Sequence, residues 1–328
     1  MKSFLSFRPY KTTRSGVALL LVIWAVAIMS ITVLGIVRLI EFNLDDESSR
    51  NIEFRARQLA ESGLSVGLHP DIKPGDPLLQ QTFGPNESFT VTIQAETSKI
   101  NINKVLLEQA ATAEEQFSQS NILVDLFASW EVPAMTALSI IACLKDWVDS
   151  DSLKNINGAE APDYQARGLP VEPTNRPFTS VDEMEFVMGI EELNAYNPNW
   201  KEAFTVFGDG KIDVNEAPAD VLALIFDLPQ EQIDSFIRLR LGPDQTPHTK
   251  DDLRFNNIEE LKSVLYIPTN PPQKYQQILN RITFNSTVWR IESEGIVNNN
   301  SKRILLIAQR EQRPPVWLAW KEWPISKR

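Results

Sequence analysis

The chain has 328 residues, a hydrophobic fraction of 43% and a formal net charge of −11, so it is long enough to bury a sizeable globular core. The excess of acidic residues argues against broad attraction to nucleic acid or to anionic lipid. The single cysteine, Cys143, excludes an intramolecular disulfide, and its apolar surroundings in the sequence predict a small buried side chain.

The N-terminal segment joins a basic stretch to an apolar one. Residues 1–16 contain four basic and no acidic residues, and residues 17–37 contain no charge, over the length of about 20 residues that a membrane-spanning helix needs. The positive-inside rule keeps the basic end cytoplasmic and exports the rest. Three alternatives fit: a signal peptide cut after Ala27, an uncleaved anchor, or a leader cut at Gly16 before the apolar run. The first would leave an apolar new terminus.

The sequence at this junction, Ser-Gly-Val-Ala-Leu-Leu-Leu-Val-Ile-Trp at 15–24, resembles the start of general secretion pathway protein K, a minor pseudopilin of bacterial type II secretion systems. The resemblance implies a prepilin peptidase cut between Gly16 and Val17 and methylation of the mature protein. Most pilins and pseudopilins have Glu as the fifth mature residue, where this chain has Leu21. That departure agrees with the K subfamily.

Helical periodicity continues beyond the apolar run. Apolar residues recur at helical spacing as far as Leu64, and no proline occurs before Pro70, which predicts one helix over residues 17–67. Its length would be roughly 75 Å at 1.5 Å per residue. A long helix that is lipid-soluble in its first half and amphipathic in its second is typical of pilins, and residues 57–64 again resemble the K family.

Strand-like sequence occurs early and late in the remainder. Residues 89–93 alternate in strand fashion, and 288–297 and 303–309 read as a hairpin around a turn at 298–301. Because neighbouring strands are usually close in sequence, we expect an α+β fold in which a small antiparallel sheet is interrupted by a large inserted all-α domain. The expected parts are a pseudopilin head (71–104 and 281–312), the insert (105–280) and a tryptophan-rich tail (313–328).

The expected insert contains a weak internal repeat. Residues 178–190 match residues 255–267, and each copy has a predicted capping box, Ser180 with Glu183 and Asn257 with Glu260. A second pair of similar segments is 99–103 and 211–215. These half-motifs also resemble the helix-hairpin-helix element of DNA-binding proteins, the rival class of function. Acidic residues follow each candidate hairpin and would repel phosphate, so no nucleic acid is expected as a partner.

An acidic segment after the apolar run at 138–144 concentrates hard oxygen donors, which suit calcium; its spacing is not that of an EF-hand, and a solvated acidic loop is the alternative. The pattern Asp-Trp-Val-Asp-x-Asp at 146–151, with the residues that follow it as far as 178, resembles the strongest sequence signature of the K family. The resemblance implies calcium as a cofactor. The candidate ligands are Asp149, Asp151, Glu160 and Asp163, with Asp146 beside them.

The resemblance implies a non-enzymatic subunit that caps the tip of the secretion pseudopilus and supports protein export across the outer membrane. Its expected partners are the I- and J-type minor pseudopilins, prepilin peptidase and the inner-membrane secretion platform. The expected location is the bacterial inner membrane, with a single pass and the bulk of the chain periplasmic. A type IV pilus minor pilin and a membrane-tethered hydrolase remain alternatives; a deep pocket with two carboxylates of shifted pKa would favour the hydrolase.

Overall fold

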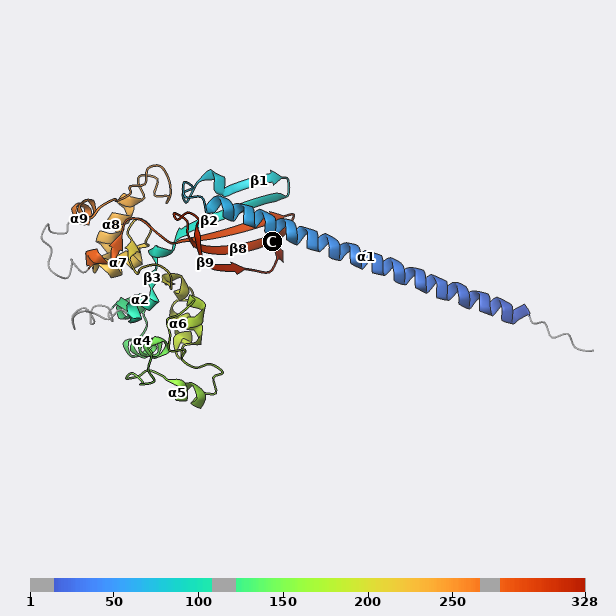
Figure 1. Cartoon of the computed structure of the whole chain (residues 1–328), viewed down its shortest axis with the longest axis horizontal. Helices are drawn as coiled ribbons and strands as arrows, with labels where there is room; N and C mark the ends of the chain where they lie inside the picture. Colours follow the sequence, from blue (N-terminus) through green and yellow to red (C-terminus); the bar gives the residue numbers. More distant parts are fainter. Residues whose placement is uncertain (1–14, 108–121, 266–277, 328) are drawn as a thin grey trace, which may run out of the picture. The chain divides into compact units, whose positions relative to one another are not determined.

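The computed structural model describes residues 15–107, 122–265 and 278–327, so residues 1–14 of the expected leader and residues 266–267 of the internal repeat lie outside it. Contacts divide the chain into two units that meet at Arg55 and Ala56. The helix α1, Ser15–Gly67, runs through this boundary without interruption (Figure 1), as the periodicity predicts.

The first half of α1 is apolar enough to cross a membrane. The candidate span is Val17–Phe42, with a mean hydropathy of 2.8 over its most apolar window. Its hydroxyl groups bond within the helix: Ser30 Oγ donates to the Val26 carbonyl and Thr32 Oγ1 to the Ile28 carbonyl, both at 2.8 Å. No hydroxyl of this pair therefore requires water, which suits a helix in lipid.

The second half of α1 packs on an antiparallel sheet with the strand order β1-β2-β7-β8-β10, in which β9 also pairs with β8. The strands are β1 Gln80–Gly84, β2 Glu87–Ala95, β7 Trp289–Val297, β8 Asn300–Gln309, β9 Val316–Glu322 and β10 Ser326–Lys327. A short helix, η1 Pro77–Leu79, precedes β1. The hairpin expected near the C-terminus is confirmed, whereas the tail that was set apart contributes β9 and β10 to the sheet.

Small residues bring α1 close to the sheet. Ala56 and Ala60 of the helix are fully buried, and Gly295 of β7 lies directly beneath them: a Cβ atom at Gly295 would overlap the carbonyl oxygen of Ala56 and the amide of Ala60. Alternate residues of β2, β7 and β8 complete an apolar core with α1. The helix can therefore pack this closely on the sheet only because Gly295 has no side chain, which leaves the two backbones in direct contact.

The chain between β2 and β7 forms a larger helical region with its own core. Its helices are α2 Ile102–Leu107, α4 Ala134–Val148, α5 Ala161–Ala166, α6 Leu193–Tyr196, α7 Ala219–Phe226, α8 Gln230–Arg240 and α9 Ile258–Leu265. Four 3-10 helices accompany them in the described residues: η2 Glu96–Ser98, η3 Val181–Phe186, η4 Ile190–Glu192 and η5 Trp200–Ala203.

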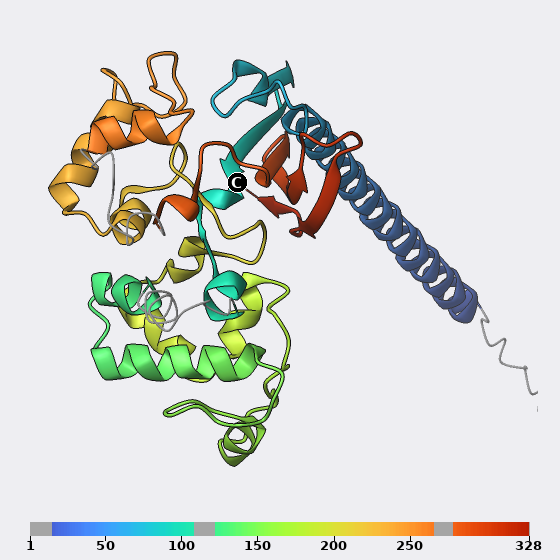
Figure 2. The same cartoon turned by 60° about the vertical axis from the view of Figure 1, so that its left-hand side comes forward.

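Two pairs of short parallel strands, not predicted by the sequence, also occur in this region. β3 Ile100–Asn101 pairs with β4 Phe204–Thr205, and β5 Ile212–Asp213 pairs with β6 Ile282–Thr283. In each pair, the first strand begins one of the two repeated segments of the helical region, and the second strand ends that same segment. The helical region is therefore two successive units of the same design, which can be followed in Figure 2 as green and orange groups of helices.

The repeat is carried by two asparagines that make the same contacts. Asn103 accepts from the Phe178 amide at 2.8 Å and donates to the Phe178 carbonyl at 2.9 Å. Asn215 does the same with Phe255 at the same two distances. Each asparagine side chain bonds the backbone amide and carbonyl of its phenylalanine, as a neighbouring β-strand would. It thereby fixes the position at which this distant phenylalanine packs into the core.

The predicted capping boxes are only partly formed. Ser180 caps η3, a 3-10 helix, through the Asp182 amide, and Glu183 accepts from the Thr179 amide instead of that of Ser180. In the second copy Asn257 accepts from the Glu260 amide as expected, while Glu260 accepts from the amide of Asn256. In both copies the glutamate therefore accepts a hydrogen bond from the amide of the residue before the N-cap, and not from the amide of the N-cap itself.

Candidate metal centre in the acidic loop

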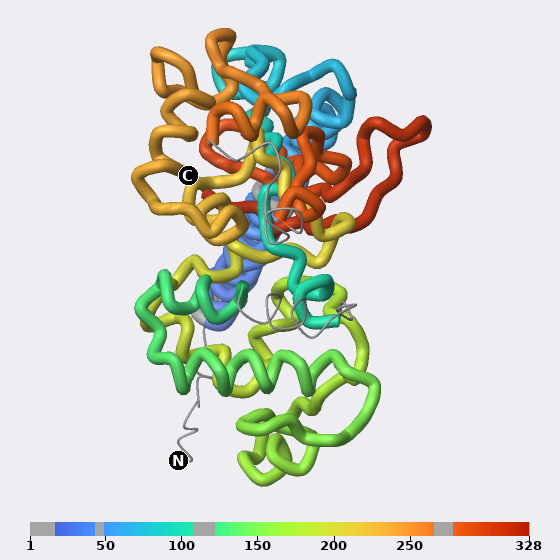
Figure 3. Tube along the Cα trace, turned by 90° about the vertical axis from the view of Figure 1, so that its left-hand side faces the viewer, coloured from blue at the N-terminus to red at the C-terminus, as the bar shows by residue number. Residues whose placement is uncertain are grey.

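The acidic loop begins at the end of α4 and runs to η3, along the green segment of the trace in Figure 3. The helix α4 buries most of one face in the helical core, and Asp146 lies on that face with no exposed surface. Asp146 Oδ1 accepts from the amide and the side-chain nitrogen of Asn155. Asp146 Oδ2 is buried and has no hydrogen-bond partner.

The loop closes over this free oxygen at Gly158. A Cβ atom at Gly158 would overlap Asp146 Oδ2, so only glycine lets the chain pass here. Asn157, just before it, adopts a left-handed backbone conformation with φ 66°, and its carbonyl accepts from Ser139 Oγ at 3.1 Å. The loop is thus held against α4 by backbone contacts on either side of the carboxylate.

Two further carboxyl groups from the loop leave a buried oxygen without a partner, Asp149 Oδ1 and Glu160 Oε1. Burial, followed by the charges of Asp151 and Asp146, raises the pKa of Asp149. Burial, followed by the charges of Asp146 and Asp149, raises the pKa of Glu160. The charges of these carboxylates therefore disfavour one another's ionised form. Buried acceptors normally have a donor, and a cation would satisfy all three.

The other two candidate ligands are engaged elsewhere. Asp151 is exposed and its Oδ1 accepts from the Leu153 amide at 2.7 Å. Asp163 accepts from Lys154 Nζ at 2.7 Å and from the Glu160 amide at 3.0 Å, and the hydrogen bond from Lys154 holds the pKa of Asp163 below its usual range. Among the candidate ligands, Asp146, Asp149 and Glu160 therefore have a buried oxygen without a partner, whereas Asp163 bonds the Glu160 amide.

The donor set suits a hard cation, although the described residues contain no group of three His, Cys, Asp or Glu side chains already arranged as a metal site. The unpaired oxygens reflect the chemistry of the loop, whereas the missing group of three reflects the spacing of its side chains. The unpaired oxygens favour a cation, because each of the three carboxylates leaves one buried oxygen without a donor, and such an oxygen is costly. Calcium, with six to eight oxygen ligands in variable geometry, is the cation that they fit best.

The remaining signature residues support the loop. Trp147 is buried and packs against Tyr164 at 5.7 Å between ring centroids and against Phe178 at 6.4 Å. The Asn175 amide donates to the Trp147 carbonyl at 3.0 Å, and its side chain donates to the Asp151 carbonyl at 3.0 Å. These contacts tie the two ends of the loop together. Cys143, close by on α4, is buried as predicted, and burial raises the pKa of its thiol to about 11.

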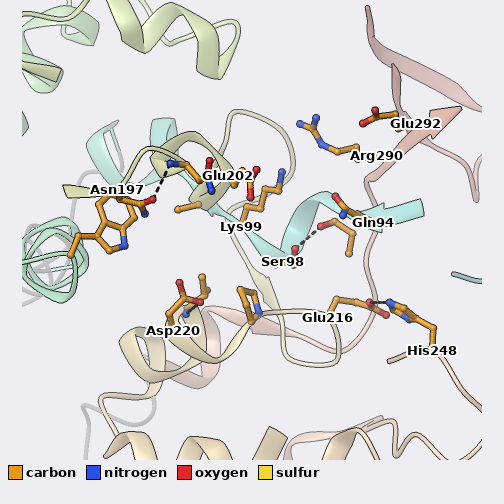
Figure 4. A pocket seen from close by; sticks show the side chains of 16 residues that line it. Gln94, Ser98, Lys99, Asn197, Glu202, Glu216, Asp220, His248, Arg290 and Glu292 are labelled. Atoms are coloured by element: carbon orange, nitrogen blue, oxygen red, sulfur yellow. Dashed lines mark hydrogen bonds and ion pairs between the residues drawn. The ribbon is translucent and has the colours of Figure 1, made fainter. Parts of the chain in front are cut away.

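A separate polar cavity of about 690 Å³ lies between η2, η5, α7 and β7, and sequence reasoning did not find it (Figure 4). Lys99 and Arg290 line it and both reach the buried Glu96, while His248 lies 3.9 Å from Glu216. Asp149 and Glu160 do not line it. The carboxyl groups with raised pKa values in the acidic loop therefore lie outside this cavity.

Comparison with known proteins agrees with this architecture. The family described as type II secretion system (T2SS), protein K, matches residues 98–196 through its first domain, the segment that contains the acidic loop. No curated protein matches the chain. Among solved structures, a chain of the GspK-GspI-GspJ complex of the enterotoxigenic Escherichia coli Type 2 Secretion System is similar, with 17% sequence identity and a TM-score of 0.60.

That match covers 87% of this chain and 99% of the other. At this identity the likeness establishes the fold, and the matched family model covers residues 98–196. Residues 98–196 are therefore similar to the first domain of type II secretion system protein K, and the chain as a whole is similar in fold to a chain of the GspK-GspI-GspJ complex.

Proposed function

We propose that this chain is a K-type minor pseudopilin that caps the tip of the type II secretion pseudopilus and so supports protein export across the outer membrane. The observation that carries the proposal is the helical region between β2 and β7, which enlarges the head far beyond its sheet. Pilin-type subunits stack through their N-terminal helices, and a head of this size would block a subunit above it. The structure of GspK in complex with GspI and GspJ supports I- and J-type pseudopilins as partners.

The N-terminal segment supplies the membrane part of this proposal. The span Val17–Phe42 would anchor the chain once in the inner membrane, with the body periplasmic, before assembly on the secretion platform. Prepilin peptidase would cut between Gly16 and Val17 on the cytoplasmic side, and the new terminus would be methylated. A structural subunit of this kind needs no catalytic residues.

Leu21 supports a position at the tip. A carboxylate in an apolar helix bundle is expensive unless it meets a positive group, and in pilin-like fibres that group is the N-terminal amine of a neighbouring subunit. A subunit with none above it has no amine to meet. An apolar residue at Leu21 removes the cost.

Calcium would hold the acidic loop closed. Asp146, Asp149 and Glu160 would bind it through their unpaired oxygens, and Asp151 would add its charge from the loop surface. Asp163 would act from outside, through the Glu160 amide. The ion would supply positive charge to a loop that otherwise gathers carboxylates, so its role is structural.

The position in the fibre is tested by labelling. Gold-labelled antibody against the helical region should mark one end of isolated pseudopili, and deletion of residues 105–280 with the strands rejoined should lengthen the pseudopili or impair their initiation. Leu21→Glu is the companion variant, because it changes the membrane helix and leaves the head intact. Label spread along the fibres would reject the tip position while leaving the family assignment in place.

A further inference from the structure

The strand β9 forms an open edge of the sheet. In the described residues it pairs only with β8, and it runs along the border of the sheet in Figure 1. The Trp323 amide donates to the Arg303 carbonyl of β8 at 3.1 Å. Because backbone groups of an antiparallel strand alternate between its two sides, the amides of Glu322 and Trp320 point away from β8.

The side chains of β9 extend the core onto this edge. Trp317 lies opposite Ala308 and Trp320 opposite Leu306, and both partners belong to the core under α1. Directly opposed residues share one face of a sheet. The two indole rings stack at 5.3 Å, yet Trp317 is 58% and Trp320 39% exposed. The apolar face of the sheet is therefore buried at β8, and the same face is exposed to solvent at β9.

The opposite edge of the sheet is built differently. The strand β1 is five residues long, mostly polar, and interrupted between Thr82 and Gly84. Short, polar and irregular edges are how proteins prevent unwanted strand pairing. β9 has seven residues, no proline and exposed apolar side chains on both faces, including Leu318. β9 also has a register irregularity beside Ile307 and Ala308 and one lysine, Lys321, so its edge differs from that of β1 chiefly in being longer and more apolar.

The segment that contains β9 has a small excess of basic residues in an acidic protein. Residues 310–327 contain four basic and two acidic residues, whereas the whole chain carries −11. Lys321 lies opposite Leu305, on the other face from the tryptophans, and its Nζ binds Asp182 at 2.9 Å. An added strand would thus meet an apolar surface on one face and a lysine on the other.

We infer that β9 receives an added β-strand from another polypeptide, one that alternates apolar residues, facing Trp317 and Trp320, with acidic residues near Lys321. A lipid surface fits less well, because it would leave the outward amides of β9 without acceptors. Strand addition satisfies these amides and covers the indole rings together. The inference concerns the tail alone and depends neither on the tip position nor on calcium.

Photo-crosslinking in the native membrane tests the surface. Benzoylphenylalanine would replace Trp317 or Trp320 in the full chain, and Phe83, which is 59% exposed on β1, would be the control position. We expect adducts from 317 and 320 but not from 83, mapped by mass spectrometry to an acidic, strand-forming segment of another protein. Equal yields at 83, or adducts with lipid or a second copy of this chain, would overturn the inference.

Blocking the edge tests the strand. We expect Leu318→Lys to lower the adduct yield from position 320 by about tenfold, since a charge on an edge strand disfavours pairing. Phe83→Lys, the same change on the other edge, should leave the yield unchanged. Thermal unfolding of the full chain verifies that each variant is folded, and Val316→Lys serves if Leu318→Lys is not. An unchanged yield in a folded variant would refute strand addition.

Discussion

Asp146 shows how the acidic loop differs from ordinary surface acid. One oxygen is bonded to Asn155, the other is buried against Gly158 without a donor. A solvated loop would keep such a group at its surface. The sequence places Asp146 at the edge of the candidate site, and the structure places it at the centre, because the helical face that buries Trp147 also buries its neighbour. Helix phase, and not the count of acidic residues, decides which carboxylates converge.

Calcium should stabilise the protein through these residues. At a free concentration of 100 times Kd, binding to the folded state alone contributes about 2.7 kcal/mol, so thermal unfolding in detergent should shift upward relative to chelator. Asp149→Asn with Glu160→Gln should abolish the shift and raise stability in chelator, since it removes repulsion between carboxylates. Asp71→Asn, on an exposed acid outside the loop, should change neither. Identical melting of the wild type in both conditions would exclude a stabilising ion.

Glu96 should govern part of the stability in acid. Burial alone would raise its pKa, but hydrogen bonds and charge from Arg290, with Lys99, bring it below the ordinary value of 4.5. A lowered pKa means that the carboxylate stabilises the fold above pH 4.5, and that this contribution is lost as pH falls through the pKa of the folded state. Glu96→Gln should weaken the fold at neutral pH by about 1–3 kcal/mol and flatten its pH dependence between pH 4.5 and lower values.

The measurement is the free energy of unfolding by denaturant across this pH range. Glu172→Gln, at an exposed position, is the matched control and should retain the wild-type slope. A slope that is unchanged in Glu96→Gln would show that the Glu96 and Arg290 contact does not contribute to acid sensitivity.

At the scale of elements, the contact between α1 and the sheet allows a clear test. Gly295→Ala should force the helix away from β7, because its Cβ would meet backbone atoms of Ala56 and Ala60, which cannot rotate aside. We expect a loss of about 1–3 kcal/mol in the free energy of unfolding. Gly84→Ala is the control, since nothing lies within 4 Å of its added Cβ. Equal stability of the two variants would mean that α1 shifts at no cost.

The sequence predicted the elements whose pattern is local. The helix α1 has unbroken periodicity, and β7 alternates before an asparagine-rich turn that an apolar run, β8, follows. It did not predict β9, which is exposed on both faces and so lacks alternation, nor the two-residue strands, which exist only through distant partners. The asparagine pairs explain the weak repeat: the similar segments were visible, but their contacts with Phe178 and Phe255 required the fold.

For the whole molecule, processing is the observation that separates the N-terminal alternatives. Mass spectrometry of the protein extracted from its membrane should find Val17 as the first residue, because the apolar helix must survive the cut to anchor the chain. An intact Met1 would indicate an uncleaved anchor, and a terminus at Ile28 would indicate a conventional signal peptide; either would contradict the prediction. Replacement of Gly16 by a bulky residue should block cleavage, whereas the same replacement at Gly35, within α1, should not.

The interruption of the sheet has a consequence for the order of folding during export. Glu96, at the end of β2, meets its partner Arg290 across 194 residues, whereas each unit of the helical region closes over shorter distances. Closing a long loop is slow, and short-range contacts form first. The helical region can therefore fold before β2 pairs with β7. The sheet can form only when β7 and β8, near the C-terminus, are available, so on the proposed export route the last part of the chain to cross the membrane would complete the sheet.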